Sequence, residues 1–536
     1  MEHLTSKQKT AIMMAIMASM LFAALNQTII GNIMPIIISK LNGMDYFQWV
    51  FTIYMLTSSV TAILAGKLSD IFGRKPLLLI GLCIFILGSF LCGTSKDIIQ
   101  LIIWRGLQGL GGGVIMSTAF AAVGDLFPPR QRGRWQGIMS GIFGFSSIIG
   151  PTIGGYIVDH FDWHWCFWIF LPFGIVAWVL IWKLFPGIRN TEEGSVDIAG
   201  SVLLTSVIVP ILLAFSWAGK EYAWDSAMIL GLFGAAALSL VLFLLVERKA
   251  ASPVLPLGMF KNSVFTLSNV VNFLTGMGMF GTIMYAPFFI QGVMGKSATA
   301  SSLLTMPLTL GMVIASIFAG QWMTRTGKYK RMAIIGLFVM AAGMFLLTRL
   351  PVDAENLEVI LPLTVVGLGL GTSFPVFTLT VQNAVEHRHL GVATSAVQLF
   401  RQLGGTIGVS VMGYIMGSSM QSQLQEKMAH LSANRSAGAI QTPAIQDPNV
   451  LMNHAELEKI RESLPEPAVQ LFDKMIQLFK EAMAASLHDV FLIGCFLVLA
   501  ATVLSFLVRE VPLKTTNRDD ADTSREEENA SVEVVS

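Results

Sequence analysis

Long uninterrupted apolar runs most restrict what this chain can fold into. A helix needs about 20 mostly apolar residues to cross a bilayer, and the sequence contains fourteen such runs. They begin near Ala11, Phe47, Pro76, Ile98, Trp135, Cys166, Ile198, Ala227, Val264, Ser301, Met332, Val359, Val392 and Val490. Charged residues make up only 13% of the chain and hydrophobic residues 54%, which excludes soluble globular, fibrous and secreted proteins. We therefore predict an all-α polytopic membrane protein with 14 transmembrane helices.

Lys and Arg are distributed unequally between the two sides of these runs. If the amino terminus is cytoplasmic, 22 of them fall in cytoplasmic segments and only 5 in the short outer loops. Cytoplasmic loops of membrane proteins carry such an excess of basic residues. We expect a plasma-membrane protein with both termini in the cytoplasm. The net charge of +1 gives no reason to expect a nucleic-acid partner.

One connection is far longer than the others and lies on the outer side. It covers residues 418–489, and helical apolar spacing within it at 456–464 and 468–487 predicts an amphipathic hairpin that caps the outer face. The last residues, 514–536, are charged and poor in apolar side chains. Such a composition is typical of a disordered tail, here on the cytoplasmic side.

The chain contains an internal repeat at an offset of 254 residues. The segment AGKLSDIFGRK matches AGQWMTRTGKY and places Gly66 over Gly320. Repeats in the same orientation are common in transporters, where the substrate path lies between them. We predict two six-helix lobes at 1–190 and 251–513, joined by two inserted helices at 191–250.

The loop after the second run combines glycines with opposite charges. Gly66 and Gly73 permit tight turns, and Asp70 can pair with a nearby cation such as Arg74. This loop resembles the loop signature of the major facilitator superfamily, whose members have a two-lobed helical bundle.

The fifth run carries closely spaced small residues around one proline. These residues are Gly144, Gly150, Pro151, Gly154 and Gly155. The pattern resembles the antiporter signature of the same superfamily, and fourteen runs indicate its drug:proton antiporter branch. Gly144, Gly150 and Gly154 are predicted to share one helix face that admits a neighbouring helix. Close packing without a role in coupling is the alternative interpretation.

The resemblance implies roles for several charged residues. Asp70, Arg74 and Asp125 would form an ion-pair cluster on the cytoplasmic face that, with Gly66 and Gly73, acts as a conformational switch. Arg105, on the same run as Asp125, would take part with it in proton coupling. The alternative is that the basic residues of the loop only fix the topology.

The middle of the apolar runs holds two arginines and no carboxylate. Arg105 and Arg401 fall within the fourth and thirteenth runs, where an ionisable group is by default functional, although backbone carbonyls could also hold either one. Asn26 stands where the family usually carries an aspartate. Because an amide carries no titratable proton, the sequence leaves proton coupling to carboxylates near the cytoplasmic ends.

Polar side chains within the runs are the candidates for substrate contacts. The predicted substrate-binding residues are Asn26, Gln27, Tyr54, Gln108, Asn269, Asn272, Gln398 and Arg401. A mostly apolar pocket with a few polar groups suits a lipophilic ligand. Hydrogen bonding between helices is the alternative role for the asparagines.

These features predict a secondary transporter rather than an enzyme. It would export amphipathic drugs or lipophilic compounds by alternating access, with a small-molecule substrate, protons as coupling ion and the lipid bilayer as its surroundings. No cofactor or metal site is expected, because the sequence has no phosphate-binding glycine loop and no metal-ligand spacing of its four cysteines. The alternatives are a permease for an anionic or neutral metabolite and a non-transporting membrane sensor or assembly protein.

Overall fold

A computed structural model describes residues 4–41, 47–186, 197–219, 221–250, 252–433, 461 and 466–510. This part of the chain is helical and contains no strand beyond one isolated bridge. The α-helices are α1 (Ser6–Leu41), α2 (Phe47–Phe72), α3 (Arg74–Cys92), α4 (Ile98–Leu126), α5 (Pro129–His160), α6 (Trp165–Trp168), α7 (Leu171–Leu184), α8 (Ile198–Trp217), α9 (Ala227–Glu247), α10 (Ser263–Phe288), α11 (Ala298–Thr326), α12 (Lys330–Leu347), α13 (Asn356–Asn383), α14 (Leu390–Ala433) and α16 (Glu466–Leu507). Short turns of other helix types lie at Leu257–Lys261, Phe289–Val293 and His387–His389.

Thirteen helical segments of the described chain are long and apolar enough to cross a membrane. The one other predicted run, the thirteenth, which begins near Val392, lies in α14. That helix is less apolar because Gln398, Arg401 and Gln402 interrupt it. It still packs inside the bundle against α2, α10 and α16. The prediction of an all-α polytopic bundle is confirmed.

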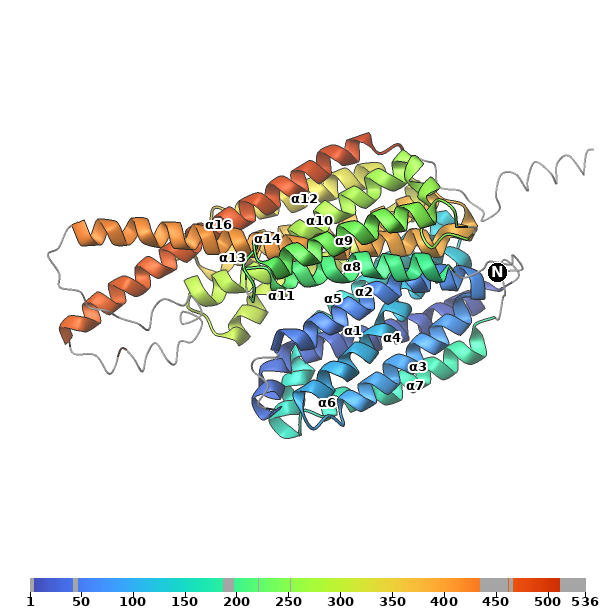
Figure 1. Cartoon of the computed structure of the whole chain (residues 1–536), viewed down its shortest axis with the longest axis horizontal. Coiled ribbons are helices and arrows are strands. Elements are labelled where there is room, and N and C mark those ends of the chain that lie inside the picture. Colours follow the sequence, from blue (N-terminus) through green and yellow to red (C-terminus); the bar gives the residue numbers. More distant parts are fainter. Residues whose placement is uncertain are drawn as a thin grey trace, which may run out of the picture.

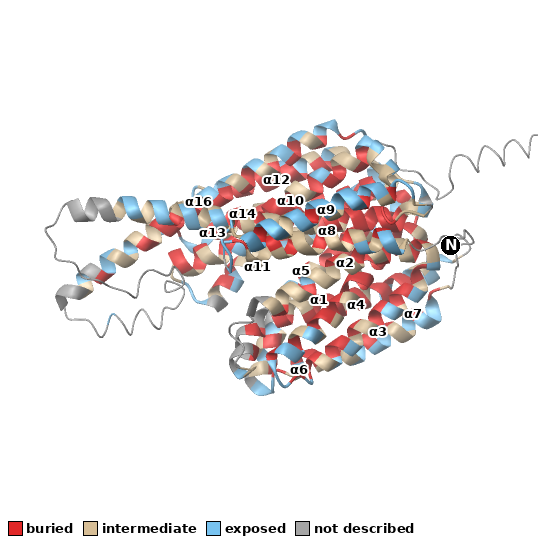
Figure 2. Ribbon diagram, viewed as in Figure 1, coloured by how far each residue is buried: buried red, intermediate tan, exposed pale blue. Residues whose placement is uncertain are grey.

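The helices form two lobes, each with its own apolar core (Figures 1 and 2). The core of the first lobe comes from α1 to α7 and includes Phe85 and Phe167. The core of the second lobe comes from α10 to α16 and includes Leu363 and Phe491. Burial of apolar area stabilises each lobe separately, so one lobe can move against the other without opening either core.

The linker helices α8 and α9 pack against each other beside the junction between the lobes. A third apolar cluster joins Ile63 of α2, Leu212 of α8 and Val397 of α14. Helix α8 therefore contacts both lobes at once.

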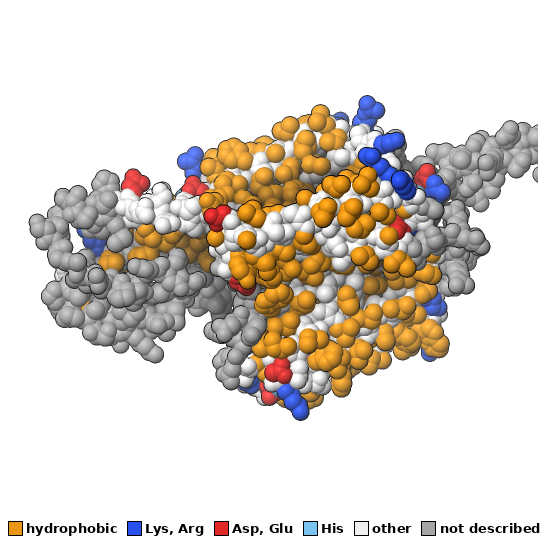
Figure 3. Space-filling model, viewed as in Figure 1, with side chains coloured by type: hydrophobic (Ala, Val, Ile, Leu, Met, Phe, Trp, Pro, Cys, Tyr) orange, Lys and Arg blue, Asp and Glu red, His pale blue; other side chains and the backbone are white. Residues whose placement is uncertain are grey.

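Apolar side chains cover the lateral surface of the bundle. Figure 3 shows a broad apolar band on this face, with charged side chains at its two ends. Large exposed apolar residues on several helices contribute to the lateral surface, among them Ile80, Phe173, Phe338 and Phe496. A surface of this kind is stable only against lipid.

The two ends of the bundle differ in the chain segments that lie there. The terminal end is where α1 begins and α16 ends, and the hairpin end is the opposite one, where α14 and α16 continue past the bundle (Figure 1). The sequence predicts a hairpin that caps this face, but the described parts of α14 and α16 project away from it, because each helix continues without a break. Residues 434–460 and 462–465 of the hairpin and the predicted tail at 514–536 lie outside the described residues.

Glycines terminate equivalent helices of the two repeats. Gly73 separates α2 from α3 with a φ of +90°, and Gly327 ends α11 with a φ of +69°. Residues with a Cβ rarely adopt such angles. The two glycines are 254 residues apart in the sequence, which is the offset of the repeat.

Candidate functional site

Three charged side chains meet at the terminal end of the first lobe. Nη2 of Arg74 lies 2.6 Å from Oδ1 of Asp70, and Nε of Arg74 donates a 2.7 Å hydrogen bond to Oδ2 of Asp125. The Arg74 side chain is only 5% exposed, and it also donates to the hydroxyl of Ser69. A buried guanidinium between two carboxylates is stable only while both partners stay in place. The structure thus brings together all three charged residues predicted for the switch.

Asp70 also reaches the second lobe. Its Oδ1 accepts a hydrogen bond from the Gly391 amide at 3.0 Å, and its Oδ2 accepts one from the Val392 amide at 3.1 Å. These amides open α14, where the helix dipole favours a negative charge. A Cβ on Gly66 would lie 2.7 Å from the Gly391 carbonyl oxygen, so glycine is required for this contact. We name the α2–α14 contact the acidic seam.

A second contact closes the lobes at the same end, between α5 and α11. A Cβ on Gly137 would lie 2.5 Å from the Ser316 carbonyl oxygen. Nε and Nη2 of Arg130 donate 3.2 Å hydrogen bonds to the carbonyls of Thr324 and Arg325 at the end of α11. We name this contact the basic seam. Gly137 is the repeat equivalent of Gly391, so the two seams are related by the internal repeat and differ in the sign of their charge.

Arg105 lies in a polar network inside the first lobe. Its Nη1 donates a 2.6 Å hydrogen bond to Oε1 of Gln108, and its Cζ lies 4.4 Å from the ring centroid of Tyr54. Gln108 in turn donates to Oδ1 of Asn26 at 2.9 Å and to the hydroxyl of Ser89 at 2.5 Å. The Arg105 side chain is about 1% exposed, and its Nε has no partner among the described residues. The network contains no carboxylate.

Arg105 and Asp125, the two residues predicted to take part in proton coupling, do not contact each other. They are twenty residues apart on α4, which at 1.5 Å per residue is about 30 Å. Asp125 instead pairs with Arg74, and Arg105 with the amide of Gln108.

The predicted substrate-binding residues lie in separate places. Asn26, Tyr54 and Gln108 belong to the Arg105 network. Asn269 and Asn272 are buried and donate to carbonyls one turn back in their own helix, α10, where a short amide side chain finds its nearest acceptor. In this structure these five residues do not line one common pocket.

Two of the three remaining residues, Gln398 and Arg401, lie at the junction between the lobes. Nε2 of Gln398 donates to the Met116 carbonyl of the first lobe at 3.4 Å. Arg401 places its Cζ 3.9 Å from the ring centroid of Phe374. Gln27 of α1 is half-buried.

The glycines of the antiporter motif in α5 face two different helices rather than one. Gly144 faces Val313 of α11, whereas a Cβ on Gly154 would lie 3.1 Å from Ile29 of α1, and Gly150 faces Thr28 of the same helix. Six residues along a helix turn the side chain by roughly two-thirds of a revolution, which explains the different neighbours. Gly155 meets nothing within 4 Å. Pro151 lies within α5.

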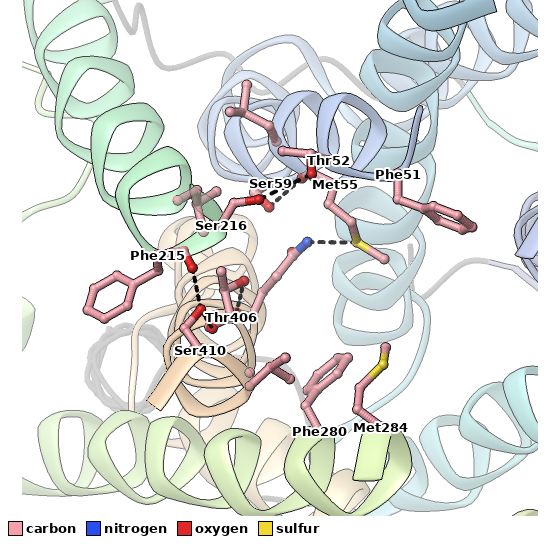
Figure 4. A pocket seen from close by; sticks show the side chains of 15 residues that line it. Phe51, Thr52, Met55, Ser59, Phe215, Ser216, Phe280, Met284, Thr406 and Ser410 are labelled. Carbon is pink, nitrogen blue, oxygen red and sulfur yellow. Dashed lines mark hydrogen bonds between the residues drawn. The ribbon is translucent and has the colours of Figure 1, made fainter. Parts of the chain in front are cut away.

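A cavity of about 240 Å³ lies between the two lobes and the linker, lined by α2, α8, α10 and α14. Figure 4 shows its side chains converging from these helices. Its polar groups are Thr52, Ser59, Ser216, Gln402, Thr406 and Ser410, and its larger apolar groups include Phe51, Met55, Phe215, Phe280 and Met284. All fifteen lining residues are uncharged, so the cavity suits a lipophilic molecule with a few hydrogen-bonding groups.

Sequence reasoning missed this cavity, although one signal pointed to it. Gln402, Thr406 and Ser410 recur every four residues, which places them on one face of α14. In the structure this face meets the linker and the first lobe, where Nε2 of Gln402 lies 3.6 Å from the sulfur of Met55 and Ser410 donates to the Phe215 carbonyl.

Comparisons with known proteins agree with this architecture. A family model described as Major Facilitator Superfamily matches residues 16–409. The chain is 38% identical over 536 residues to the multidrug transporter protein MdtP of Bacillus subtilis (strain 168), which covers 99% of this chain and 98% of the relative. It is 31% identical to multidrug resistance protein 3 of the same organism, over 96% of this chain and 98% of that one.

Solved structures support the same fold at low sequence identity. The proton:xylose symporter XylE superposes with a TM-score of 0.61 at 14% identity, covering 96% of this chain and 98% of the symporter. The human organic anion transporter MFSD10 gives a TM-score of 0.57 at 14% identity, covering 91% of this chain and 99% of the other. At these identities the likeness concerns the fold alone.

Proposed function

Because this chain belongs to the major facilitator superfamily, a family of membrane transporters, we propose that it exports amphipathic drugs or lipophilic compounds across the plasma membrane with protons as the coupling ion. The main support for this proposal is the uncharged cavity between the lobes. Its apolar walls and scattered hydroxyl groups suit varied ligands without a fixed charge. Two relatives named as multidrug proteins support the same substrate class.

The proposed mechanism is alternating access, with the terminal end in the cytoplasm. The acidic and basic seams close this end beneath the cavity. Opening toward the cytoplasm must break the bonds from Asp70 to the Gly391 and Val392 amides, and a proton on Asp70 would weaken them by removing its charge. Proton binding and opening are then linked through one carboxyl group.

Export measured in vesicles tests this proposal. Everted vesicles from cells that express the chain should accumulate a lipophilic fluorescent drug when the lumen is acidified. A protonophore should abolish the accumulation, because it removes the pH gradient. Vesicles without the chain are the control. Accumulation that ignores the protonophore would contradict proton antiport, and absence of any drug movement would contradict export.

Arg401 favours a second candidate function, a permease for an anionic or neutral metabolite. Its guanidinium lies over Phe374 at the junction between the lobes. The middle of every predicted span lacks Asp and Glu, so an anionic substrate would meet a cation there and no fixed negative charge. Export of anionic amphiphiles in the same vesicles, with cationic ones excluded, would favour this function.

Phe280→Ala should weaken export of bulky aromatic drugs by about tenfold, because an aromatic side chain contributes a large contact area to a ligand. Phe280 lines the cavity from α10. The matched control is Phe338→Ala on α12, whose side chain is 61% exposed on the lateral surface. Concentration dependence of export in vesicles measures the effect. Equal losses in both variants would show that the cavity does not bind the drug.

A further inference from the structure

Two acidic side chains of the linker helices meet near the terminal end of the bundle. Asp197 caps the start of α8, and Glu247 is the last residue of α9. These ends are neighbours because α8 and α9 pack against each other along their length. Neither residue belongs to the acidic seam.

Each carboxyl group has one satisfied oxygen and one that lacks a partner. Oδ1 of Asp197 accepts a 2.8 Å hydrogen bond from the Gly200 amide, and Oε1 of Glu247 accepts a 2.6 Å bond from the Leu255 amide. Oδ2 of Asp197 and Oε2 of Glu247 are buried without a partner among the described residues. The Glu247 residue is only 3% exposed.

The two unpartnered oxygens face the same small space. A Cβ on Gly200 would lie 2.7 Å from Oε2 of Glu247 and still closer to Oδ2 of Asp197. Two ionised carboxylates cannot share a buried site without strong repulsion. One proton shared between the two oxygens would remove this repulsion and would let one carboxyl donate a hydrogen bond to the other.

We propose that Asp197 and Glu247 bind one proton between Oδ2 and Oε2, which makes the linker a proton-binding site. Among the described residues, the charged group that faces both carboxyls is Lys67 of α2, which also interacts with Asp70 of the acidic seam and with Arg388. Loss of the proton increases the negative charge beside Lys67. The site deepens the proposed function by giving the coupling ion a second position, but its existence does not depend on drug export.

Infrared spectroscopy of the purified full-length protein tests the site directly. A pH titration near neutrality should show the band of a protonated carboxyl group in the wild type. Glu247→Gln should remove the band while preserving the fold, since its carbonyl still accepts from Leu255 and its amide can donate to Asp197. Asp197→Asn should also remove it, because asparagine remains a good helix cap. Glu386→Gln is the matched control, since Glu386 is exposed at the same end.

Thermal unfolding gives a second readout. A proton held more tightly by the folded than the unfolded chain stabilises the protein as pH falls. The wild-type Tm should therefore rise between about pH 8 and about pH 6 more than that of Glu247→Gln. The proposed site would be refuted if the wild type showed no titrating carboxyl band, or if Glu247→Gln kept the band unchanged. The wild type could show a carboxyl band that Glu247→Gln loses and still export no drug. That result would support the proton site and contradict only the proposed function.

Discussion

Arg74→Ala should reduce drug export about 100-fold or more without preventing membrane insertion. The variant removes the cation that lies between Asp70 and Asp125, and breaking a buried ion pair in this way costs about 3–5 kcal/mol. Asp70→Asn should reduce export similarly, because it removes the charge that holds the amides of α14. Export in everted vesicles, normalised to the amount of inserted protein, measures both effects.

The matched control for this prediction is Arg388→Ala. Arg388 pairs with Glu386 at 2.6 Å at the same end of the bundle, but both side chains are more than half exposed. Such a pair contributes about 0–1 kcal/mol, so export should stay close to that of the wild type. Full activity of both Arg74→Ala and Asp70→Asn would refute the switch and leave the loop with a topological role only.

Two substitutions of Arg105 should distinguish the contribution of its side-chain volume from the contribution of its charge. Arg105→Ala leaves a cavity beside Tyr54 and removes the hydrogen-bond donor to Oε1 of Gln108. These two losses should lower the free energy of unfolding by about 2–5 kcal/mol. Arg105→Met fills most of the same volume and removes a buried cation that has no carboxylate in its network, so its stability should be close to that of the wild type.

The two variants differ in what they should do to transport. If the charge of Arg105 is needed for coupling, the well-folded Arg105→Met should lose export driven by a pH gradient at least tenfold. Thermal unfolding and vesicle export on the same preparations make the comparison. Wild-type export by Arg105→Met would show that Arg105 serves packing alone.

The acidic seam could be only half predicted from the sequence. Asp70 and Arg74 are four residues apart and part of a family signature, and Asp125 followed from the resemblance. The Gly391 and Val392 amides could not be predicted, because they lie more than 300 residues away and depend on how the lobes close. The internal repeat nevertheless marked Gly66 and Gly391 as equivalents of Gly320 and Gly137, and all four glycines lie in the seams.

The predicted substrate-binding residues do not converge in this structure, because a sequence does not show where a polar side chain points. Asn26 and Gln108 turn into the first lobe, toward Arg105. Asn269 bonds to a carbonyl of its own helix. Apolar runs fixed the number of helices, since length and hydropathy decide insertion into a bilayer. The direction of each polar group was decided by packing between helices that no single segment encodes.

Helix α14 is one unbroken rod of 44 residues, or about 66 Å at 1.5 Å per residue. Its first amides donate to Asp70, and Gln402 in its middle lines the cavity. Near its far end, Nζ of Lys427 lies 2.5 Å from Oε2 of Glu481 in α16. If the proposed alternating access frees Asp70 by tilting α14, the part of this helix that projects past the bundle would be displaced further than its first turn. A distance probe attached near Lys427 would then follow the proposed opening at the terminal end from the far side of the bundle.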